Sequence, residues 1–178
     1  KAINGIIDNS ASVVKGRSTN YEVFKLIQEK GTEEISQYTF LVGYSLDLAY
    51  NFMKIEREKD ENRTYIWDRY SHCIEAYFKA LDLDLRGVLP IIYIVKKAYI
   101  TFYLDIEPEL AVNRIKQRGG ITKPLENVNY LSKVRDQYNR IINASDVKII
   151  DASKSQDEVH KEIWKKYLLY NTGFERRD

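Results

Sequence analysis

The sequence predicts an α/β domain with a parallel sheet, and three features of the chain indicate it. Short runs of β-branched and aromatic residues alternate with helical patterns of ten or more residues, as in strands joined by crossover helices. The 178 residues suffice for one well-buried domain. The 44% hydrophobic and 30% charged residues are ordinary for a globular protein. We therefore expect a single domain over residues 1–178 with right-handed crossovers.

The first part of the chain predicts one strand among helices. Residues 1–9 have the pattern of the end of a helix, and residues 11–14, ASVV, form a short strand pattern. Residues 21–30 predict a helix, and a longer helix begins near residue 32. Its wide apolar stripe predicts extensive burial and contains Ile35, Tyr38, Val42, Ala49, Phe52 and Met53.

The middle of the chain predicts two further strands, each followed by a helix. Residues 64–67, TYIW, have the continuous apolar pattern of a parallel strand covered on both faces. The helix after them is expected to continue over residues 74–85. Residues 98–106, AYITFYLDI, form the clearest strand pattern, and a proline then opens a helix over residues 107–118. A Gly-Gly pair ends that helix.

The last part of the chain predicts a helix, a strand and a closing helix. A polar loop precedes a helical pattern over residues 128–144, and residues 147–153, VKIIDAS, predict the last strand. An amphipathic helix over residues 155–170 follows. Ser155 and Glu158 stand three residues apart at its start, which is the spacing of a capping box.

Composition excludes several classes of partner. The 28 basic and 26 acidic residues give a net charge of +2 and are mixed along the chain, so nucleic acid is not expected as a partner. The single cysteine, Cys73, allows no internal disulfide, and the two histidines lack zinc-site spacing. The longest apolar run, residues 88–95, is far shorter than the roughly 20 residues that cross a bilayer. We expect no membrane partner and a reducing compartment.

Three predicted strands end in charged residues, where open parallel sheets bind ligands. Arg17 follows the first strand, Asp68 and Arg69 follow TYIW, and Asp105 ends AYITFYLDI. Two arginines at neighbouring strand ends can clamp a phosphate through forked, charge-assisted hydrogen bonds. The alternative is that each arginine pairs with a carboxylate at the rim, and the strand pattern alone leaves both open.

A second basic cluster surrounds the Gly-Gly pair. Arg114 and Arg118 are four residues apart on the predicted helix, so their guanidinium groups point the same way. Lys116 and Lys123 add further charge. A basic loop next to glycines is typical of a lid that closes over phosphates. Equally, cations at a helix C-terminus complement its dipole, and both interpretations remain open here.

Five motifs occur in order between Tyr65 and Leu168. They are DRY, Ala76-Tyr77, YLDIEPELAVNRIKQRG, LENVNYLSKVRDQY and IIDASKSQDEVHKEI. In this order and at these spacings the chain resembles the thymidylate kinase family of nucleoside monophosphate kinases. The resemblance implies a three-layer α/β/α fold of the P-loop NTPase type, with a lid near residues 114–128.

The resemblance also implies an activity. It is the transfer of the γ-phosphoryl group of ATP, with Mg²⁺, to a (deoxy)nucleoside 5′-monophosphate, giving the diphosphate. Such transfer depends on in-line positioning and charge neutralisation more than on covalent help from the protein. The resemblance further implies a homodimer in the cytoplasm.

Residue roles follow from the family motifs. The acceptor phosphate would be held by Arg69 and Arg17, and Asp68 would act near the metal or orient the acceptor. The nucleoside would face Tyr77 and Glu126. Arg118 would neutralise the charge that develops on the transferred group. The ATP side would be formed by Arg114, Arg118, Ala152, Ser153 and Lys154.

Two departures from the family pattern concern the P-loop and the base pocket. The motif G-x-x-x-x-G-K-S/T does not occur in the 178 residues, and we expect it upstream of Lys1. Where the family carries an aromatic residue and, four residues on, an arginine, alignment from Asp68 gives Gly43 and Asp47. Phe40 and Tyr44 restore an aromatic pair if the following loop is longer. Cys73 and Phe78 stand where a serine and a glutamine are expected. An acid at residue 47 would suit a base edge with an amino group, and it could equally cap a solvent-exposed face. Thymidylate is the default substrate.

Two other functions remain as alternatives. A catalytically inactive relative would keep the fold as a nucleotide-binding or interaction subunit, and it would lack the P-loop. A deoxynucleoside kinase would phosphorylate a 5′-hydroxyl group instead. Two arginines that bind phosphate, Arg17 and Arg69, would have no role toward such a neutral acceptor.

Overall fold

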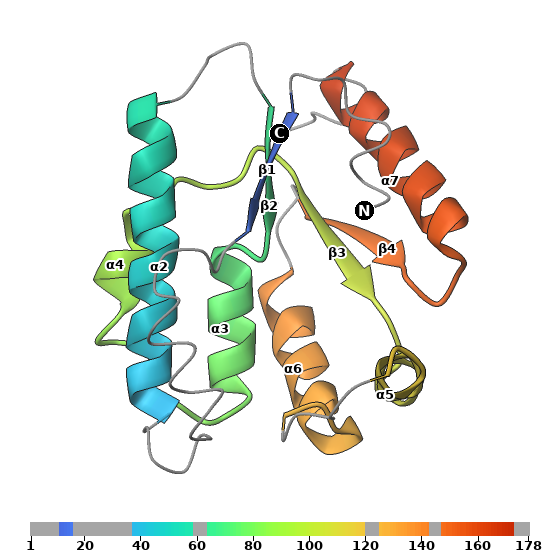
Figure 1. Cartoon of the computed structure of the whole chain (residues 1–178), viewed down its shortest axis with the longest axis horizontal. Coiled ribbons are helices and arrows are strands. Elements are labelled where there is room, and N and C mark those ends of the chain that lie inside the picture. Colours follow the sequence, from blue (N-terminus) through green and yellow to red (C-terminus); the bar gives the residue numbers. More distant parts are fainter. Residues whose placement is uncertain (1–10, 16–36, 59–63, 120–124, 143–146, 173–178) are drawn as a thin grey trace. The chain divides into compact units, whose positions relative to one another are not determined.

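The computed structural model describes residues 11–15, 37–58, 64–119, 125–142 and 147–172. Figure 1 shows its helices and strands along the chain. The chain divides into two compact units, one over Ile7–Lys97 and the other containing Ala98–Asp178. Each unit has its own pair of strands and its own helices, and each is described separately below.

The first unit is built on two parallel strands and three helices. The strands β1 (Ala11–Lys15) and β2 (Thr64–Asp68) pair in parallel, from Ala11 opposite Thr64 to Lys15 opposite Asp68. The helices are α2 (Gln37–Glu58), α3 (Ser71–Lys79) and α4 (Leu89–Tyr93). Because the first residues of the two strands pair with each other and so do the last, both strands end at the same edge.

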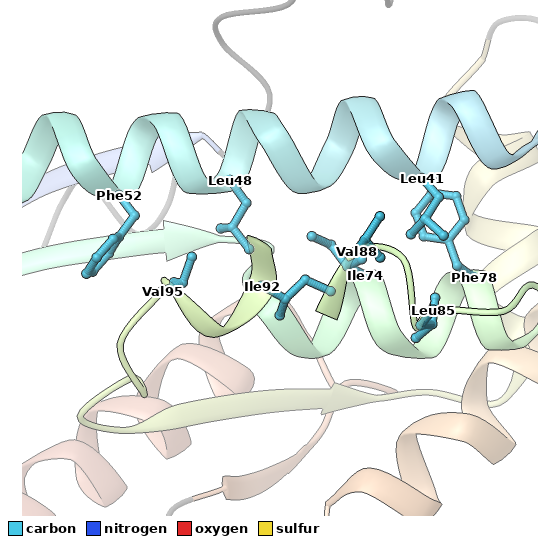
Figure 2. Close-up of a cluster of buried hydrophobic side chains, with 9 residues drawn as sticks. All are labelled: Leu41, Leu48, Phe52, Ile74, Phe78, Leu85, Val88, Ile92 and Val95. Carbon is cyan, nitrogen blue, oxygen red and sulfur yellow. The ribbon is translucent and has the colours of Figure 1, made fainter. Parts of the chain in front are cut away.

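The core of this unit is an apolar cluster between α2, α3 and α4. Figure 2 shows Leu41, Phe78 and Leu85 at one end of the cluster and Phe52 and Val95 at the other. The complete set is Leu41, Leu48, Phe52, Ile74, Phe78, Leu85, Val88, Ile92 and Val95. Burying each large side chain contributes about 1.5–3 kcal/mol, so this cluster holds α2 against the two shorter helices.

The buried face of α2 matches the predicted stripe in part. Ala49 and Phe52 of the stripe are buried, whereas Tyr38 and Met53 are 41% and 56% exposed, and Ile35 lies outside the described residues. Leu41 and Leu48, which the stripe did not include, are also buried. Polar side chains on the buried face are satisfied partly within the helix: Ser45 Oγ donates to the carbonyl of Leu41 at 2.9 Å.

Two expectations for this unit need correction. The helix predicted to continue over residues 74–85 ends at Lys79. Asp82 has a left-handed backbone with φ 57°, which stops a helix, and Asp84 then accepts a hydrogen bond from the backbone N–H of Arg86. The strand β2 was expected to be covered on both faces, yet its inner three residues are only half-buried and its ends are exposed.

The second unit repeats the pattern of strand and helix. The strands β3 (Thr101–Asp105) and β4 (Val147–Asp151) pair in parallel, from Thr101 opposite Val147 to Asp105 opposite Asp151. Its helices are α5 (Pro108–Gln117), α6 (Val128–Ile141) and α7 (Gln156–Asn171).

The helix ends of this unit match their sequence signals. Pro108 opens α5, and Gly119 follows its end with φ 77°, a conformation that glycine adopts without steric cost. The side chain of Ser155 accepts a hydrogen bond from the backbone N–H of Glu158, and Glu158 accepts one from the backbone N–H of Ser155. The predicted capping box of α7 is therefore confirmed.

The predicted α/β class with parallel strand pairing is confirmed. The strands in the described part of the chain form two separate pairs, β1 with β2 and β3 with β4. The predicted helices over residues 1–9 and 21–30 lie outside the described residues, and the single domain stays a prediction. Among the helices that the structure describes, none is long and apolar enough to cross a membrane.

Candidate active site

The shared carboxyl edge of β1 and β2 carries the first group of candidate residues. Asp68 ends β2 directly opposite Lys15, the last residue of β1. Asp68 and Arg69 are both exposed there. Arg17, the second predicted phosphate ligand, lies outside the described residues. This edge is where an open parallel sheet offers side chains to a ligand.

Arg69 has an unusual backbone conformation. Its φ is 70°, and Asp82 is the other non-glycine residue with positive φ in the described ranges. The left-handed region costs a non-glycine residue roughly 1–2 kcal/mol. Such strain persists where the surrounding structure imposes it, and it clusters at functional sites. The conformation therefore marks Arg69 independently of any sequence motif.

The guanidinium group of Arg69 lies over the ring of Tyr77, 5.2 Å from its centroid. An arginine above an aromatic face gains a cation–π attraction, and Tyr77 comes from α3, the helix that begins two residues after Arg69. Partial desolvation lowers the pKa of Arg69, but the Coulombic effects of Tyr77, Cys73, Tyr44 and Asp68 outweigh it, so the pKa is raised overall. Arg69 is a fixed cation at this strand edge.

Tyr70, the residue after Arg69, is held by a hydrogen bond and by an aromatic contact. The hydroxyl of Tyr70 donates a hydrogen bond to the carbonyl of Lys96 at 2.6 Å. Burial, assisted by nearby Glu56, raises the pKa of Tyr70 to about 12. The ring of Tyr70 also packs edge-on against Trp67, with centroids 5.1 Å apart. These contacts hold the chain on both sides of Arg69 and so help to maintain its strained backbone.

Aromatic rings from two helices meet at one end of the core. Phe40 and Tyr44 of α2 lie 4.9 Å apart between ring centroids. Phe78 of α3 lies 6.1 Å from Phe40 and 5.9 Å from Tyr44. Phe40 and Tyr44 are half-buried, whereas Phe78 is buried. The two predicted base-pocket aromatics are therefore neighbours, and they meet Phe78, which stands where the family pattern has a glutamine.

Asp47, the predicted reader of an amino group, lies elsewhere on the same helix. Its side chain is fully buried at 0% exposure, and its backbone carbonyl accepts a hydrogen bond from the side chain of Asn51 at 2.9 Å. A base could reach this carboxylate only if the packing around α2 opened.

In the second unit, Arg114 contacts the residues after β4, which the family motifs also assign to the ATP side. The guanidinium group of Arg114 donates to the carbonyls of Ala152 at 2.5 Å, Ser153 at 2.7 Å and Lys154 at 3.3 Å. Ser153 also donates through its backbone N–H and hydroxyl to Asp151, and these bonds lower the pKa of that carboxyl group. Arg114 thus fixes the turn between β4 and α7.

Arg118 lies at the end of α5 in a more open setting. Its side chain is 71% exposed, and a guanidinium nitrogen is 3.9 Å from Oε1 of Glu126. At that distance and exposure the ion pair contributes little stability. Arg118 and Glu126 are therefore adjacent, and the guanidinium group can turn toward an anionic ligand at small cost.

Arg135 is a strongly bonded residue to which the sequence motifs assigned no role. It lies on α6 and donates to both carboxylate oxygens of Asp105, at 2.8 and 2.9 Å, and pairs with Glu107 at 2.6 Å. Asp105, at the end of β3, therefore forms an ion pair with Arg135 at the edge of the strand pair. The charged end of AYITFYLDI signalled a partner, but the sequence could not indicate which arginine provides it.

The described residues offer Asp68 as a carboxylate for a metal ion, but no cluster of three His, Cys, Asp or Glu ligands. Mg²⁺ is usually bound through one or two carboxylates, substrate phosphates and water. A single exposed carboxylate beside an arginine fits that mode, whereas a zinc site would need more ligands from the protein.

The candidate residues thus form separate groups within each unit. The first unit contributes Asp68, Arg69 and Tyr77 at the strand edge. It also contributes an aromatic trio, which consists of Phe40, Tyr44 and Phe78. Residues 98–178 contribute Arg114 with the turn at residues 152–154, and Arg118 with Glu126. Cations at such positions can bind phosphate groups, and the aromatic rings can stack on a base.

Comparison with protein families gives one match that spans most of the chain. The thymidylate kinase family matches residues 16–163. The matched region contains all the candidate residues named above.

Individual proteins agree with this match. A probable thymidylate kinase of Sulfolobus acidocaldarius is 28% identical over 165 residues, covering 92% of this chain and 83% of that protein. One from Methanosarcina mazei is 33% identical over 168 residues, covering 88% and 78%. The solved thymidylate kinase of Candida albicans has a TM-score of 0.67 and 16% identity, covering 94% of this chain and 84% of that structure. At that identity the structural likeness supports the fold alone.

Proposed function

The chain belongs to the thymidylate kinase family of ATP-dependent nucleoside monophosphate kinases, and from this premise we propose which residues serve the reaction. The observation that carries the proposal is the strained Arg69 at the carboxyl edge of β2, with its guanidinium group over Tyr77. The reaction transfers the γ-phosphoryl group of ATP to a nucleoside 5′-monophosphate. It depends mainly on positioning and charge neutralisation.

Arg69 binds the phosphate of the acceptor. A phosphate dianion suits a guanidinium group because the forked donors can make two parallel charge-assisted hydrogen bonds. The left-handed backbone directs the side chain back over α3, and Tyr77 supports its planar face. Arg17 is the second ligand of this phosphate, by the family likeness.

Asp68 takes part on the metal side of the reaction. It precedes Arg69 and is exposed at the same edge. Mg²⁺, when bound, neutralises charge on the transferred phosphoryl group. The carboxylate of Asp68 would hold the ion together with substrate phosphates, and in the same position it orients the acceptor.

The aromatic residues Phe40 and Tyr44 form one side of the nucleobase site. Their half-buried rings offer stacking surface, and stacking on an aromatic ring favours any base. Phe78 closes the trio without a hydrogen-bonding group. By the family likeness, Tyr77 and Glu126 each have a role toward the nucleoside, and Asp47 would favour a base with an amino group if the packing around it opens.

ATP binds against the second unit. Adenine lies near the turn of Ala152, Ser153 and Lys154, which Arg114 holds through three carbonyls. Arg118 neutralises the charge that develops during transfer, because its side chain is largely exposed and only loosely paired. The segment near residues 114–128 acts as the lid, by family likeness.

We also propose a homodimer in the cytoplasm, by the same family likeness. A single cysteine fits a reducing compartment. Sedimentation of the full-length protein at several concentrations tests the oligomeric state, and a monomer throughout would contradict the homodimer.

The test of the proposed function is a coupled ATP-consumption assay of the full-length protein. The acceptors are a panel of nucleoside monophosphates, with the matching nucleosides as controls. We expect turnover with at least one monophosphate and none with the nucleosides. Activity on nucleosides alone would identify a nucleoside kinase, and no activity with any acceptor would favour an inactive relative.

A further inference from the structure

A single guanidinium group joins three elements of the second unit. Arg135 lies on α6, Asp105 ends β3, and Glu107 is the residue before α5. The Nε and one terminal nitrogen of Arg135 donate to the two oxygens of Asp105 at 2.8 and 2.9 Å. The other terminal nitrogen lies 2.6 Å from Oε2 of Glu107. We call these three residues the Arg135 clip.

Within the clip, Arg135 and Asp105 each stabilise the charged form of the other. The hydrogen bond from Arg135 is the main cause that lowers the pKa of Asp105, against a smaller opposing effect of desolvation. In turn the hydrogen bonds to Asp105 and Glu107 raise the pKa of Arg135. The arginine and Asp105 are each about a quarter exposed, so the pair is partly shielded from water. Its fork-to-carboxylate geometry fixes direction as well as distance.

Packing alone already holds α6 against β3. The rings of Tyr138 and Tyr103 stack with centroids 4.6 Å apart, and Tyr130 and Val134 of α6 are buried. The helix α5 is also held by packing, since its residues Pro108 and Val112 are buried, and Arg114 bonds the turn at residues 152–154. What the clip adds is a direct link between α6 and Glu107, the N-cap residue before α5, whose side chain is 63% exposed.

The direction of α5 determines the position of Arg118 at its other end. A helix of 10 residues is about 15 Å long at 1.5 Å per residue. A tilt of about 10° at its start would displace its end by roughly 2.5 Å over that length. Misplacement by about 1 Å can reduce a rate roughly 100-fold when it disturbs the reacting geometry. Glu126, the neighbour of Arg118, lies just before α6, the helix that carries Arg135.

We propose that Arg135 is a positioning residue of phosphoryl transfer: its clip on Asp105 and Glu107 sets the direction of α5 and thereby places Arg118. The proposal rests on the proposed function, in which Arg118 neutralises charge on the transferred group. Arg135 acts through Arg118 and need not touch a nucleotide.

The test is a double-mutant cycle in the full-length protein with the coupled assay. The four proteins are wild type, Arg135→Gln, Arg118→Ala and the double variant. We expect Arg135→Gln to lower kcat at least about 10-fold and to change the KM of the acceptor less than about 3-fold, because it disturbs placement and not acceptor binding. In the Arg118→Ala background the same substitution should change kcat less than about 3-fold, since residues that act as a unit are not additive.

Three further variants complete the test. Arg135→Lys keeps the charge but not the fork, so its kcat should fall nearly as far as that of Arg135→Gln. Arg140→Gln is the matched control, because Arg140 is an exposed arginine on the same helix, and its kcat should stay at the wild-type level. If Arg135→Gln does not fold, Glu107→Gln removes one bond of the clip and should still lower kcat by about 3-fold or more.

The outcomes separate the inference from the proposed function. Normal kcat in Arg118→Ala would remove Arg118 from the reaction and overturn the inference, while the kinase activity would stand. No turnover in the wild-type protein with any acceptor would overturn the proposed function. A low kcat in Arg118→Ala, with normal kcat in Arg135→Gln or Glu107→Gln, would overturn the inference alone. Equal loss from Arg135→Gln in both backgrounds would also overturn it, because the arginine would then act independently of Arg118.

Discussion

Arg69 has a strained backbone and places its charge at a strand edge. The residues around it explain the backbone conformation and the position of the guanidinium group. Tyr70 is tied to the carbonyl of Lys96, and α3 begins two residues after Arg69. These anchors leave the connecting residue in the left-handed region with φ 70°. Glycine would take this conformation without steric cost, so an arginine here trades some stability for the position of its guanidinium group over Tyr77.

Two substitutions of Arg69 separate stability from activity. In Arg69→Ala the Cβ atom keeps the backbone strained, whereas Arg69→Gly relieves it. We expect the glycine variant to be more stable than the alanine variant by about 1 kcal/mol. Both should lose at least about 100-fold in kcat/KM, because both lack the charged donor. Urea denaturation and the coupled assay measure the two effects.

The two outcomes can be checked separately. Equal stability of the glycine and alanine variants would show that the backbone at residue 69 is not strained. Near-wild-type kcat/KM in either variant would remove the side chain of Arg69 from the site.

Residue types were predictable at the candidate site, but contacts were not. The strand-end pattern found Asp68, Arg69 and Asp105, because the charge follows directly on an apolar run. It could not show that Asp105 is bound by Arg135, thirty residues away on another helix. Local sequence also gave no sign that Asp47 would be fully buried. Such features depend on how helices pack, which a single sequence encodes only indirectly.

Individual helices and strands agreed with the sequence best where a local signal ends them. The capping box starts α7, proline starts α5, and a left-handed glycine follows the end of α5. The helix α3 was predicted to be longer because its apolar periodicity continues past Lys79. There the bend at Asp82 and the hydrogen bonds of Asp84 to Arg86 outweigh the helical pattern.

The capping box of α7 gives a test at the level of one helix. Ser155→Ala removes the side-chain acceptor of the backbone N–H of Glu158, and we expect a loss of about 0.5–2 kcal/mol in the free energy of unfolding. Ser132→Ala is the control, because the hydroxyl of Ser132 bonds the carbonyl of Val128 within α6. Such bonds inside a helix do not stabilise it. Equal losses in thermal or urea unfolding would show that the box contributes nothing specific.

Across the whole molecule, the repeated order of strand and helix carried the fold prediction. Each unit contains a parallel strand pair whose register has no offset, so both strands of each pair end at one edge. Parallel pairing follows from the helical connections, which a single sequence reveals through its periodicity. The direction in which α2 faces its core followed only in part: Ala49 and Phe52 are buried as predicted, whereas Tyr38 and Met53 are exposed despite their apolar character.

Two leucines on α2 test the core of the first unit. Leu48 is 2% exposed, and Leu46, on the opposite side of the helix, is 48% exposed. Leu48→Ala leaves a cavity within the cluster of Figure 2 and should lower the free energy of unfolding by about 2–5 kcal/mol. Leu46→Ala makes the same chemical change at the surface and should alter it by less than about 0.5 kcal/mol. Similar losses in urea denaturation would contradict the assignment of the core.

The most direct test of the central claim, that Arg69 binds the acceptor phosphate, is calorimetric titration of two ligands. Thymidylate and thymidine differ only in the phosphate, and each is titrated into the wild-type full-length protein and Arg69→Ala. We predict that the substitution weakens the binding of thymidylate about 30-fold or more, the cost of losing a charged hydrogen-bond donor, and leaves thymidine binding unchanged. Equal weakening of both ligands, or no weakening of thymidylate, would contradict the claim.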